Sequence, residues 1–310
     1  MAITASMVKE LRELTGAGMM ECKKALTATD GDIDKAVEHL REKGLAAAEK
    51  KAGRIAAEGL VDVNISEDGK VASIVEVNSE TDFVAKNDKF KEYVVAVAAQ
   101  VAKTDASNVD EFLDEKWELD TTKTVREELS SMISIIGENL SIRRFEKLTV
   151  DNGLIESYIH AGGKIGILIE LETEVVNETV KEAARNVAMQ VAAMAPKYVN
   201  RDEIPEDYIN REKEILKAQV MNDPAHSKKP ENIIDKILEG RLNKELQEIC
   251  LVDQAYVKDG DLTVGKYLDS VAKEVGSSIS VKRFVRFETG EGLEKREEDF
   301  AAEVAKQMGQ

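Results

Sequence analysis

One stretch of the chain has the spacing of a phosphate-binding loop. Gly260–Lys266 places two glycines and a lysine where a P-loop uses backbone N–H groups and a lysine to hold nucleotide phosphates. However, Tyr267 replaces the Ser or Thr that would bind Mg²⁺, and Asp261 adds negative charge where phosphate would lie. The preceding residues predict a loop rather than a strand. We interpret the pattern as a turn before a helix over Val264–Val275; an enzyme that uses a nucleotide is one alternative.

The histidines and cysteines form no pattern typical of catalysis or metal binding. His39, His160 and His226 are far apart in the sequence, and no Gly-x-Ser-x-Gly motif is present. The two cysteines, Cys22 and Cys250, imply no disulfide framework, and Cys22 is expected to pack inside a helical unit. We predict no enzymatic activity, no catalytic residue, no metal and no cofactor.

The charge of the chain narrows the choice of partner. Its 310 residues carry a net charge of −17, so phosphate backbones and anionic membrane surfaces repel it. The N-terminus lacks a charged segment followed by an apolar run, and the apolar run Val94–Ala102 is too short to span a membrane. We expect a cytoplasmic protein that binds another protein, with no direct nucleic-acid partner and no membrane.

The first 45 residues predict three short helices that pack on one another. Thr4 can cap the first, which stops at Gly16, and the second runs from Gly18 to about Ala28. Asp32 can cap the third, for which Gly44 is the expected stop, and residues 46–53 look like a helical linker. The side chains expected to face inward lie at helical spacing: Met7, Val8, Leu11, Leu14, Ile33, Ala36, Val37 and Leu40.

An internal repeat follows. Segments that start at Gly59 and Gly69 match segments that start at Gly153 and Gly163 at one constant offset. Two further pairs of segments match at other offsets: Val97–Ala102 with Val187–Ala192, and Gly137–Phe145 with Gly276–Phe284. The offsets imply four extra residues in the first copy, between Glu80 and Tyr93, and a long insertion in the second copy.

Each copy predicts a β-hairpin, helices and a closing strand. Asp68-Gly69 is a hairpin turn signal after the alternating Val61, Val63 and Ile65. Residues 71–77 predict the second strand, residues 90–102 a helix, and residues 142–148 and 280–288 the closing strands. The expected fold class is α+β, with three-stranded antiparallel sheets backed by helices.

The long insertion predicts two helices, Pro205–Val220 and Glu231–Cys250. The second carries a narrow apolar stripe, typical of an antiparallel two-helix hairpin: Ile234, Leu238, Leu242, Leu246 and Ile249. The tail, Glu291–Gln310, predicts an amphipathic helix with Phe300 and Val304 on one side.

The four extra residues of the first copy fall in a segment that pairs an apolar with an acidic side chain. Phe83 follows Asp82 in an expected loop, between a strand that ends near Asn78 and a helix that starts near Asp88. Phe83 could plug the core beneath the loop. Because the second copy folds without this insertion, an exposed binding role is favoured.

Two segments resemble the signatures of the translation elongation factor Ts family: Glu76–Lys86 and Leu11–Leu26. The duplicated core, the helical hairpin and the tail, Gly290–Ala305, are also similar, so the resemblance covers essentially the whole chain. It implies these parts: a three-helix domain like ubiquitin-associated domains (1–45), a linker (46–55), core subdomain N (56–149), core subdomain C (150–289) with a coiled-coil hairpin at about 205–250, and a C-terminal helical module (290–310).

The resemblance also implies guanine-nucleotide exchange on elongation factor Tu. Phe83 would wedge between helices of the partner's nucleotide domain, and Asp82 would disturb its Mg²⁺ site, with Thr81 and Val84 beside them. Met19 and Met20 would offer an apolar contact to the same domain, although methionines at such positions also fill helix cores.

The resemblance places a second contact in the loop that contains His160, Gly162 and Gly163, and a further one in the tail helix. A different class of function stays open: an adaptor that binds the ribosome or a ubiquitin-like protein through the N-terminal helices. That alternative leaves the duplicated core and the Asp82-Phe83 insertion unexplained.

Overall fold

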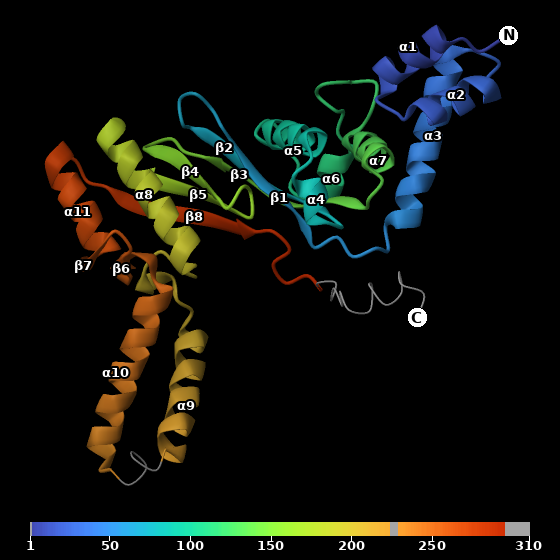
Figure 1. Ribbon diagram of the computed structural model, residues 1–310. Coiled ribbons are helices and arrows are strands. Elements are labelled where there is room, and N and C mark those ends of the chain that lie inside the picture. Colours follow the sequence, from blue (N-terminus) through green and yellow to red (C-terminus); the bar gives the residue numbers. More distant parts are fainter. Residues whose placement is uncertain (1, 224–228, 295–310) are drawn as a thin grey trace.

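The computed structural model describes residues 2–223 and 229–294. It places two three-stranded sheets against each other, with helices on their outer faces (Figure 1). A two-helix hairpin projects at one end of the molecule, and three N-terminal helices lie at the other. No helix in the described part is long and apolar enough to cross a membrane.

The N-terminal unit is built from α1 (Ala5–Thr15), α2 (Met19–Ala28) and α3 (Ile33–Lys51). The predicted caps are confirmed: the Thr4 hydroxyl accepts the Met7 N–H at 3.3 Å, and Asp32 accepts the Lys35 N–H at 3.1 Å. Gly16 ends α1 with a left-handed φ of 67°. Cys22 is fully buried in the small core of this unit, as expected.

Gly44 does not end the third helix, so that prediction is wrong. Helix α3 runs through Gly44 to Lys51 and includes most of the expected linker. Gly44 is buried against α7 (Val125–Ile136), where an added Cβ would lie 3.5 Å from the Ser130 carbonyl oxygen. Packing against α7 stabilises the helix through this position and outweighs the tendency of glycine to end a helix, which a single-sequence pattern does not detect.

The first copy of the repeat spans β1 to β3. Its strands form an antiparallel sheet in the order β1-β2-β3, and its helices lie between β2 and β3. The elements are β1 (Glu58–Ile65), β2 (Val71–Ser79), α4 (Asp82–Ala85), α5 (Asp88–Val101), α6 (Val109–Asp114), α7 and β3 (Leu140–Thr149).

The second copy spans β4 to β8, with the sheet order β4-β5-β8. The elements common to both copies are β4 (Leu154–His160), β5 (Ile165–Glu172), α8 (Glu178–Met194), α11 (Val264–Val275) and β8 (Ser280–Glu288). Between α8 and α11 lie the 3₁₀ turns Arg201–Glu203 and Leu251–Asp253, α9 (Glu206–Asn222), α10 (Glu231–Ile249), β6 (Ala255–Tyr256) and β7 (Asp259–Thr263).

The two sheets pack face to face through apolar side chains of both copies. This shared layer contains Ile74 and Leu148 from the first copy and Ile155, Leu168 and Val285 from the second. Helices α5 and α7 pack on the other side of the first sheet, and α8 and α11 on the other side of the second. The two sheets thus form a rigid centre from which the connecting segments project.

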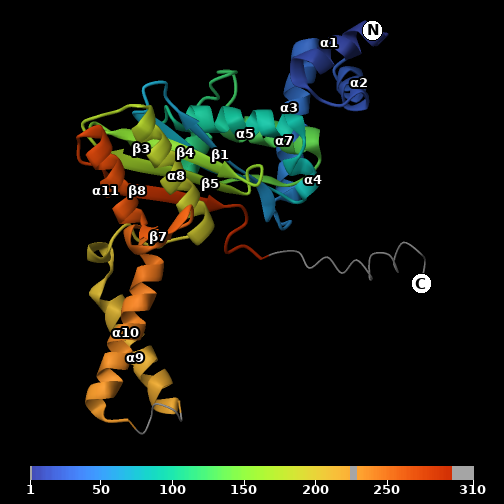
Figure 2. The ribbon, with the colours of Figure 1, turned by 60° about the vertical axis from the view of Figure 1, so that its left-hand side comes forward.

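The insertion of the second copy forms the predicted pair of helices. Helices α9 and α10 project from the core (Figure 2), and the predicted stripe packs between them, with Leu242 and Leu246 buried. At the chain end, Gly290–Leu293 form a turn where the start of a tail helix was predicted. The rest of that predicted helix, with Phe300 and Val304, lies outside the described residues.

Candidate functional site

The segment between β2 and α5 forms a one-turn helix rather than the predicted loop. Thr81 caps α4, and its backbone N–H and hydroxyl both donate to the Glu138 carboxylate, at 3.0 and 2.7 Å. On the other side of the segment, Glu80 accepts the Asn139 N–H at 2.6 Å and pairs with Arg54 at 3.3 Å. Hydrogen bonds on both sides therefore hold α4 to the rest of the first copy.

The side chains of α4 divide sharply between core and solvent. Val84 and Ala85 are buried in the core of the first copy. Phe83 is 78% exposed, so the alternative that it plugs the core is wrong. The segment presents a large aromatic side chain to solvent on a firmly anchored turn.

Asp82 stands beside Phe83 as an exposed, ionised carboxylate. Lys86 donates to it at 2.7 Å, and this hydrogen bond, helped by the positive charges of Lys86 and Lys164, holds the pKa of Asp82 below its usual value. The ammonium of Lys86 also lies 5.8 Å from the centre of the Phe83 ring. The tip of α4 thus combines an apolar ring with a negative and a positive charge.

The second predicted contact is the turn between β4 and β5. His160 is exposed at the end of β4, and the Tyr158 hydroxyl lies 3.0 Å from its Nδ1. Ala161, Gly162 and Gly163 all have left-handed φ angles. Gly163 has a φ of 96°, and a Cβ there would lie 2.7 Å from Leu60 Cδ2 and 3.3 Å from the Val61 carbonyl oxygen, so glycine is favoured where this turn touches β1.

The structure brings α4 and the β4–β5 turn to the same end of β1. At the start of that strand, Glu58 pairs with Lys164 of the turn, and the Glu58 carbonyl accepts the Asn78 side chain at 3.1 Å. The positive charge of Lys164 also helps to lower the pKa of Asp82. Two predicted contacts that are far apart in sequence therefore share one region of the surface.

The predicted N-terminal contact lies elsewhere. Met19 and Met20 are 59% and 63% exposed in the first turn of α2, so the alternative that they fill the helix core is wrong. Leu14, which was expected to face inward, is also exposed. Figures 1 and 2 place α1 and α2 at the end of α3 that is distant from the sheets.

The P-loop-like stretch has a different shape from the one predicted. Asp259–Thr263 forms β7, which pairs with β6, so the residues before the helix are a strand and not a loop. Thr263 caps α11 by accepting the Lys266 N–H at 3.2 Å, and the Lys266 side chain is exposed. Within the described residues, no group of His, Cys, Asp and Glu side chains could hold a metal ion.

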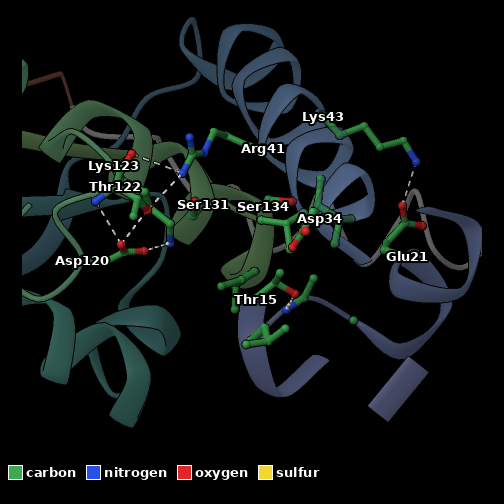
Figure 3. A pocket seen from close by; sticks show the side chains of 16 residues that line it. Thr15, Glu21, Asp34, Arg41, Lys43, Asp120, Thr122, Lys123, Ser131 and Ser134 are labelled. Carbon is green, nitrogen blue, oxygen red and sulfur yellow. Dashed lines mark hydrogen bonds and ion pairs between the residues drawn. The ribbon is translucent and has the colours of Figure 1, made fainter. Parts of the chain in front are cut away.

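Sequence reasoning missed a cleft between the N-terminal helices and the first copy (Figure 3). Arg41 of α3 reaches across it to the Thr122 carbonyl and hydroxyl, both at 3.5 Å, and to Glu127 at 4.0 Å. Both polar and apolar side chains line the cleft, and among the residues that the structure describes none of the predicted contacts lines it. Its contacts join α3 to α7 and to the loop before α7, and no sequence pattern signals a pairing between residues so far apart in the chain.

Comparison with known proteins identifies the family. A model of the family described as "Elongation factor TS" matches residues 80–291. Curated relatives named Elongation factor Ts are 57% identical over 306 residues in Clostridium kluyveri, 56% over 306 in Clostridium tetani and 54% over 308 in Clostridium novyi. Each match covers 99% of this chain and 99% of the relative. The chain therefore belongs to the elongation factor Ts family, whose name places it in the elongation step of protein synthesis.

Proposed function

We propose that this chain promotes the release of GDP from elongation factor Tu, so that GTP can bind, and that it does so by binding and not by catalysing a reaction. The observation that carries the proposal is Phe83, a large apolar side chain held in solvent by an anchored turn. An apolar ring displayed in this way favours insertion into a partner protein. We expect this to take place in the cytoplasm, without direct contact to nucleic acid or membrane.

The energetics require several contacts to act together. If a factor weakens the binding of a nucleotide ~1000-fold, the coupling free energy is roughly 4 kcal/mol, and the nucleotide weakens the binding of the factor equally. Burying one Phe contributes ~1.5–3 kcal/mol. Phe83 therefore needs help from other groups that disturb the same nucleotide site.

Several groups on the surface of the chain could make these contacts together with Phe83. Phe83 would separate helices of the partner's nucleotide domain, while the ionised Asp82 beside it would compete for the partner's Mg²⁺ or displace its ligands. The turn with His160, Gly162 and Gly163, near α4, would make a second contact. Met19 and Met20, at the far end of α3, would hold the partner through a separate apolar patch.

The decisive experiment measures the release of labelled GDP from elongation factor Tu with and without this chain. We expect faster release at sub-stoichiometric amounts of the chain, because an exchange factor leaves the complex after each event. Equilibrium dialysis of the isolated chain with GDP and with ATP should show no binding of either. Unchanged release, or tight nucleotide binding by the chain itself, would contradict the proposal.

A further inference from the structure

A fully buried carboxylate joins the two copies of the core. The Glu76 side chain in β2 has no exposed surface. It accepts hydrogen bonds from Arg144 Nε at 2.6 Å, the Gly290 N–H at 2.7 Å, and Arg143 and Asn78 at 3.0 Å each. Gly290 follows the last strand of the second copy, so this one side chain ties that copy to the first.

The residues around Gly290 lie between Glu76 and the β4–β5 turn. The Thr289 N–H donates to the Lys164 carbonyl at 2.9 Å, and the Thr289 hydroxyl donates to the Gly163 carbonyl at 3.2 Å. The next residue, Gly290, donates to Glu76. A short chain of hydrogen bonds therefore connects the turn of the second copy to β2, the strand that leads into α4.

The arginines next to Glu76 complete this connection. Arg143 donates to the Glu291 carbonyl at 2.5 Å, and Arg144 donates to the Glu288 carbonyl at 3.1 Å. Gly290 has a left-handed φ of 71°, and an added Cβ would lie 2.1 Å from the Ala57 carbonyl oxygen. The chain after β8 is thus held from several sides, and we call Glu76, Arg143, Arg144, Thr289, Gly290 and Glu291 the clasp.

The residue of the second copy that matches Glu76 is Glu170, and its described contacts form no clasp. Glu170 occupies the same place in β5, beside the same kind of strand irregularity, and pairs with Arg283 at 2.6 Å. Glu170 and Arg283 both lie in the second copy's own sheet. The single arginine partner of Glu170 is enough for a buried carboxylate within a sheet. The additional hydrogen bonds of Glu76, above all the one to Gly290 of the other copy, therefore indicate a further role.

We propose that the clasp is a positioning device that holds α4, with Phe83, and the β4–β5 turn, with His160, in one fixed relation, so that both engage the partner together. The inference rests on the proposed exchange function. Glu76 itself is a positioning residue, since its buried side chain cannot touch a partner. Holding two contacts in place beforehand lowers the entropic cost of binding.

The first test needs no partner. Glu76→Gln keeps the shape of the side chain but removes its charge and turns an NH₂ group toward the arginines. We expect hydrogen exchange at the Thr289 and Gly290 amides to speed up in this variant and to stay unchanged in the matched control Glu170→Gln. Unchanged protection of both amides in Glu76→Gln would overturn the clasp.

The second test measures GDP release from elongation factor Tu at increasing concentrations of the chain. With Glu76→Gln we expect the half-saturating concentration to rise about 10-fold and the maximal rate to stay within about 2-fold, because the bound complex is the same once formed. Glu170→Gln should shift neither value by more than about 2-fold. An equal response of the two variants, or a loss confined to the maximal rate, would overturn the positioning role.

A second variant keeps the test decisive if Glu76→Gln does not fold. Gly290→Ala pushes the clasp away from Ala57 while Glu76 stays intact, and Gly292→Ala is its control, because Gly292 has a similar φ of 72° but open space around it. Only Gly290→Ala should raise the half-saturating concentration; equal behaviour of the two would overturn the proposal. If the unmodified chain fails to accelerate GDP release, the proposed function is wrong, and hydrogen exchange still decides whether the clasp exists.

Discussion

The two copies of the core share a scaffold and differ in what is attached to it. Both contain three antiparallel strands, and in both the pairing shifts at a buried glutamate, Glu76 in the first and Glu170 in the second. The first copy adds α4 between β2 and α5, whereas the second adds the α9–α10 hairpin after α8. This difference indicates that the repeat supplies the common scaffold and that the copy-specific segments are where binding functions are expected.

The likeness of the copies extends to a buried glutamine. Gln100 donates to the Lys116 carbonyl at 2.9 Å and accepts the Glu118 N–H at 3.0 Å. Gln190 does the same with Ala255 and Val257, at 3.0 and 2.8 Å. In each copy the amide thus fixes a short hairpin that leads into the last helix. The P-loop-like stretch begins in this hairpin of the second copy and ends in the first turn of α11, where Thr263 has a structural role as the helix cap.

The largest effect should come from the glycines that open β1 and β4. A Cβ on Gly59 would lie 2.1 Å from the Val77 carbonyl oxygen, and one on Gly153 would lie 1.8 Å from that of Leu171. Both φ angles are positive, so Gly59→Ala and Gly153→Ala should each cost about 3 kcal/mol or more in the free energy of unfolding. Denaturant titration measures this, with Gly260→Ala, which has open space around it, as the control. A large loss at one glycine alone would break the equivalence of the copies.

The next largest effect is expected from Phe83→Ala, which should weaken binding to the partner without weakening the fold. Phe83→Ala should slow exchange about 10–100-fold, from the loss of ~1.5–3 kcal/mol of burial in the complex. The melting temperature should hardly change, because Phe83 is exposed in the free chain. Val176→Ala is the matched control, since Val176 is an exposed apolar residue in the corresponding connection of the second copy. A marked drop in melting temperature, or exchange equal to that of the unmodified chain, would refute the wedge role of Phe83.

Sequence patterns predicted much of the scaffold because strands, caps and repeats have local signals. The strand Ser280–Glu288 and the helix Val264–Val275 agree with the structure residue for residue. The predictions are wrong where the local conformation depends on a contact with a residue that is distant in the sequence. The pattern around Gly44 predicts a helix end because it contains no sign of the contact with Ser130 in another helix, and the sequence predicts no α4 because Glu138, which binds the cap residue Thr81, comes from the turn before β3.

The candidate site was predictable only in part, for the same reason. The Asp82-Phe83 pair stood out because the repeat isolates it, whereas its exposure depends on Val84 and Ala85 facing inward. The importance of Glu76 was not visible, since its partner Gly290 lies near the other end of the chain. The domain boundaries stay a prediction.

A smaller effect is the pH dependence of stability, which we expect to have opposite signs for Glu76 and Asp62, two acidic residues of the first sheet. Burial raises the pKa of Glu76, but its hydrogen bonds outweigh burial, so its pKa lies below the usual value of a glutamate. Its ionised form therefore stabilises the fold at neutral pH, and this stabilisation is lost as the pH falls through the folded-state pKa. Melting curves between about pH 7 and about pH 3, the range in which carboxyl groups titrate, should show less acid sensitivity in Glu76→Gln than in the unmodified chain.

Asp62 in β1 provides the contrasting case. Burial raises the pKa of Asp62 above the usual value of an aspartate, so its ionised form is unfavourable in the folded chain, and the penalty grows as the pH rises through the folded-state value. Asp62→Asn should therefore increase stability at neutral pH and lose this advantage in acid. The same sign of pH response in Glu76→Gln and Asp62→Asn would refute the roles assigned to their surroundings.

A still smaller effect on folding is expected from the hairpin of the second copy. Its buried side chains, such as Leu216, Leu242 and Leu246, form a cluster separate from the two main cores. Replacing residues 208–245 with a short Gly/Ser linker should leave cooperative thermal unfolding of the core intact, because insertions at surface positions are tolerated. If cooperative unfolding is lost, the hairpin is a part of the core and not an attachment to it.

The smallest expected effect is that of Lys266→Ala, which should leave the exchange rate and the melting temperature unchanged within error. The lysine of a P-loop contacts phosphate, but Lys266 projects into solvent from the first turn of α11, and the strand β7 before it pairs with β6. In the first copy, Thr124 caps α7 as Thr263 caps α11, and the residue three positions after Thr124 is Glu127. A carboxylate at the matching position shows that the scaffold needs no cation there. A large loss of exchange with an intact fold would restore the nucleotide-binding interpretation and show that the second copy holds a site that the first lacks.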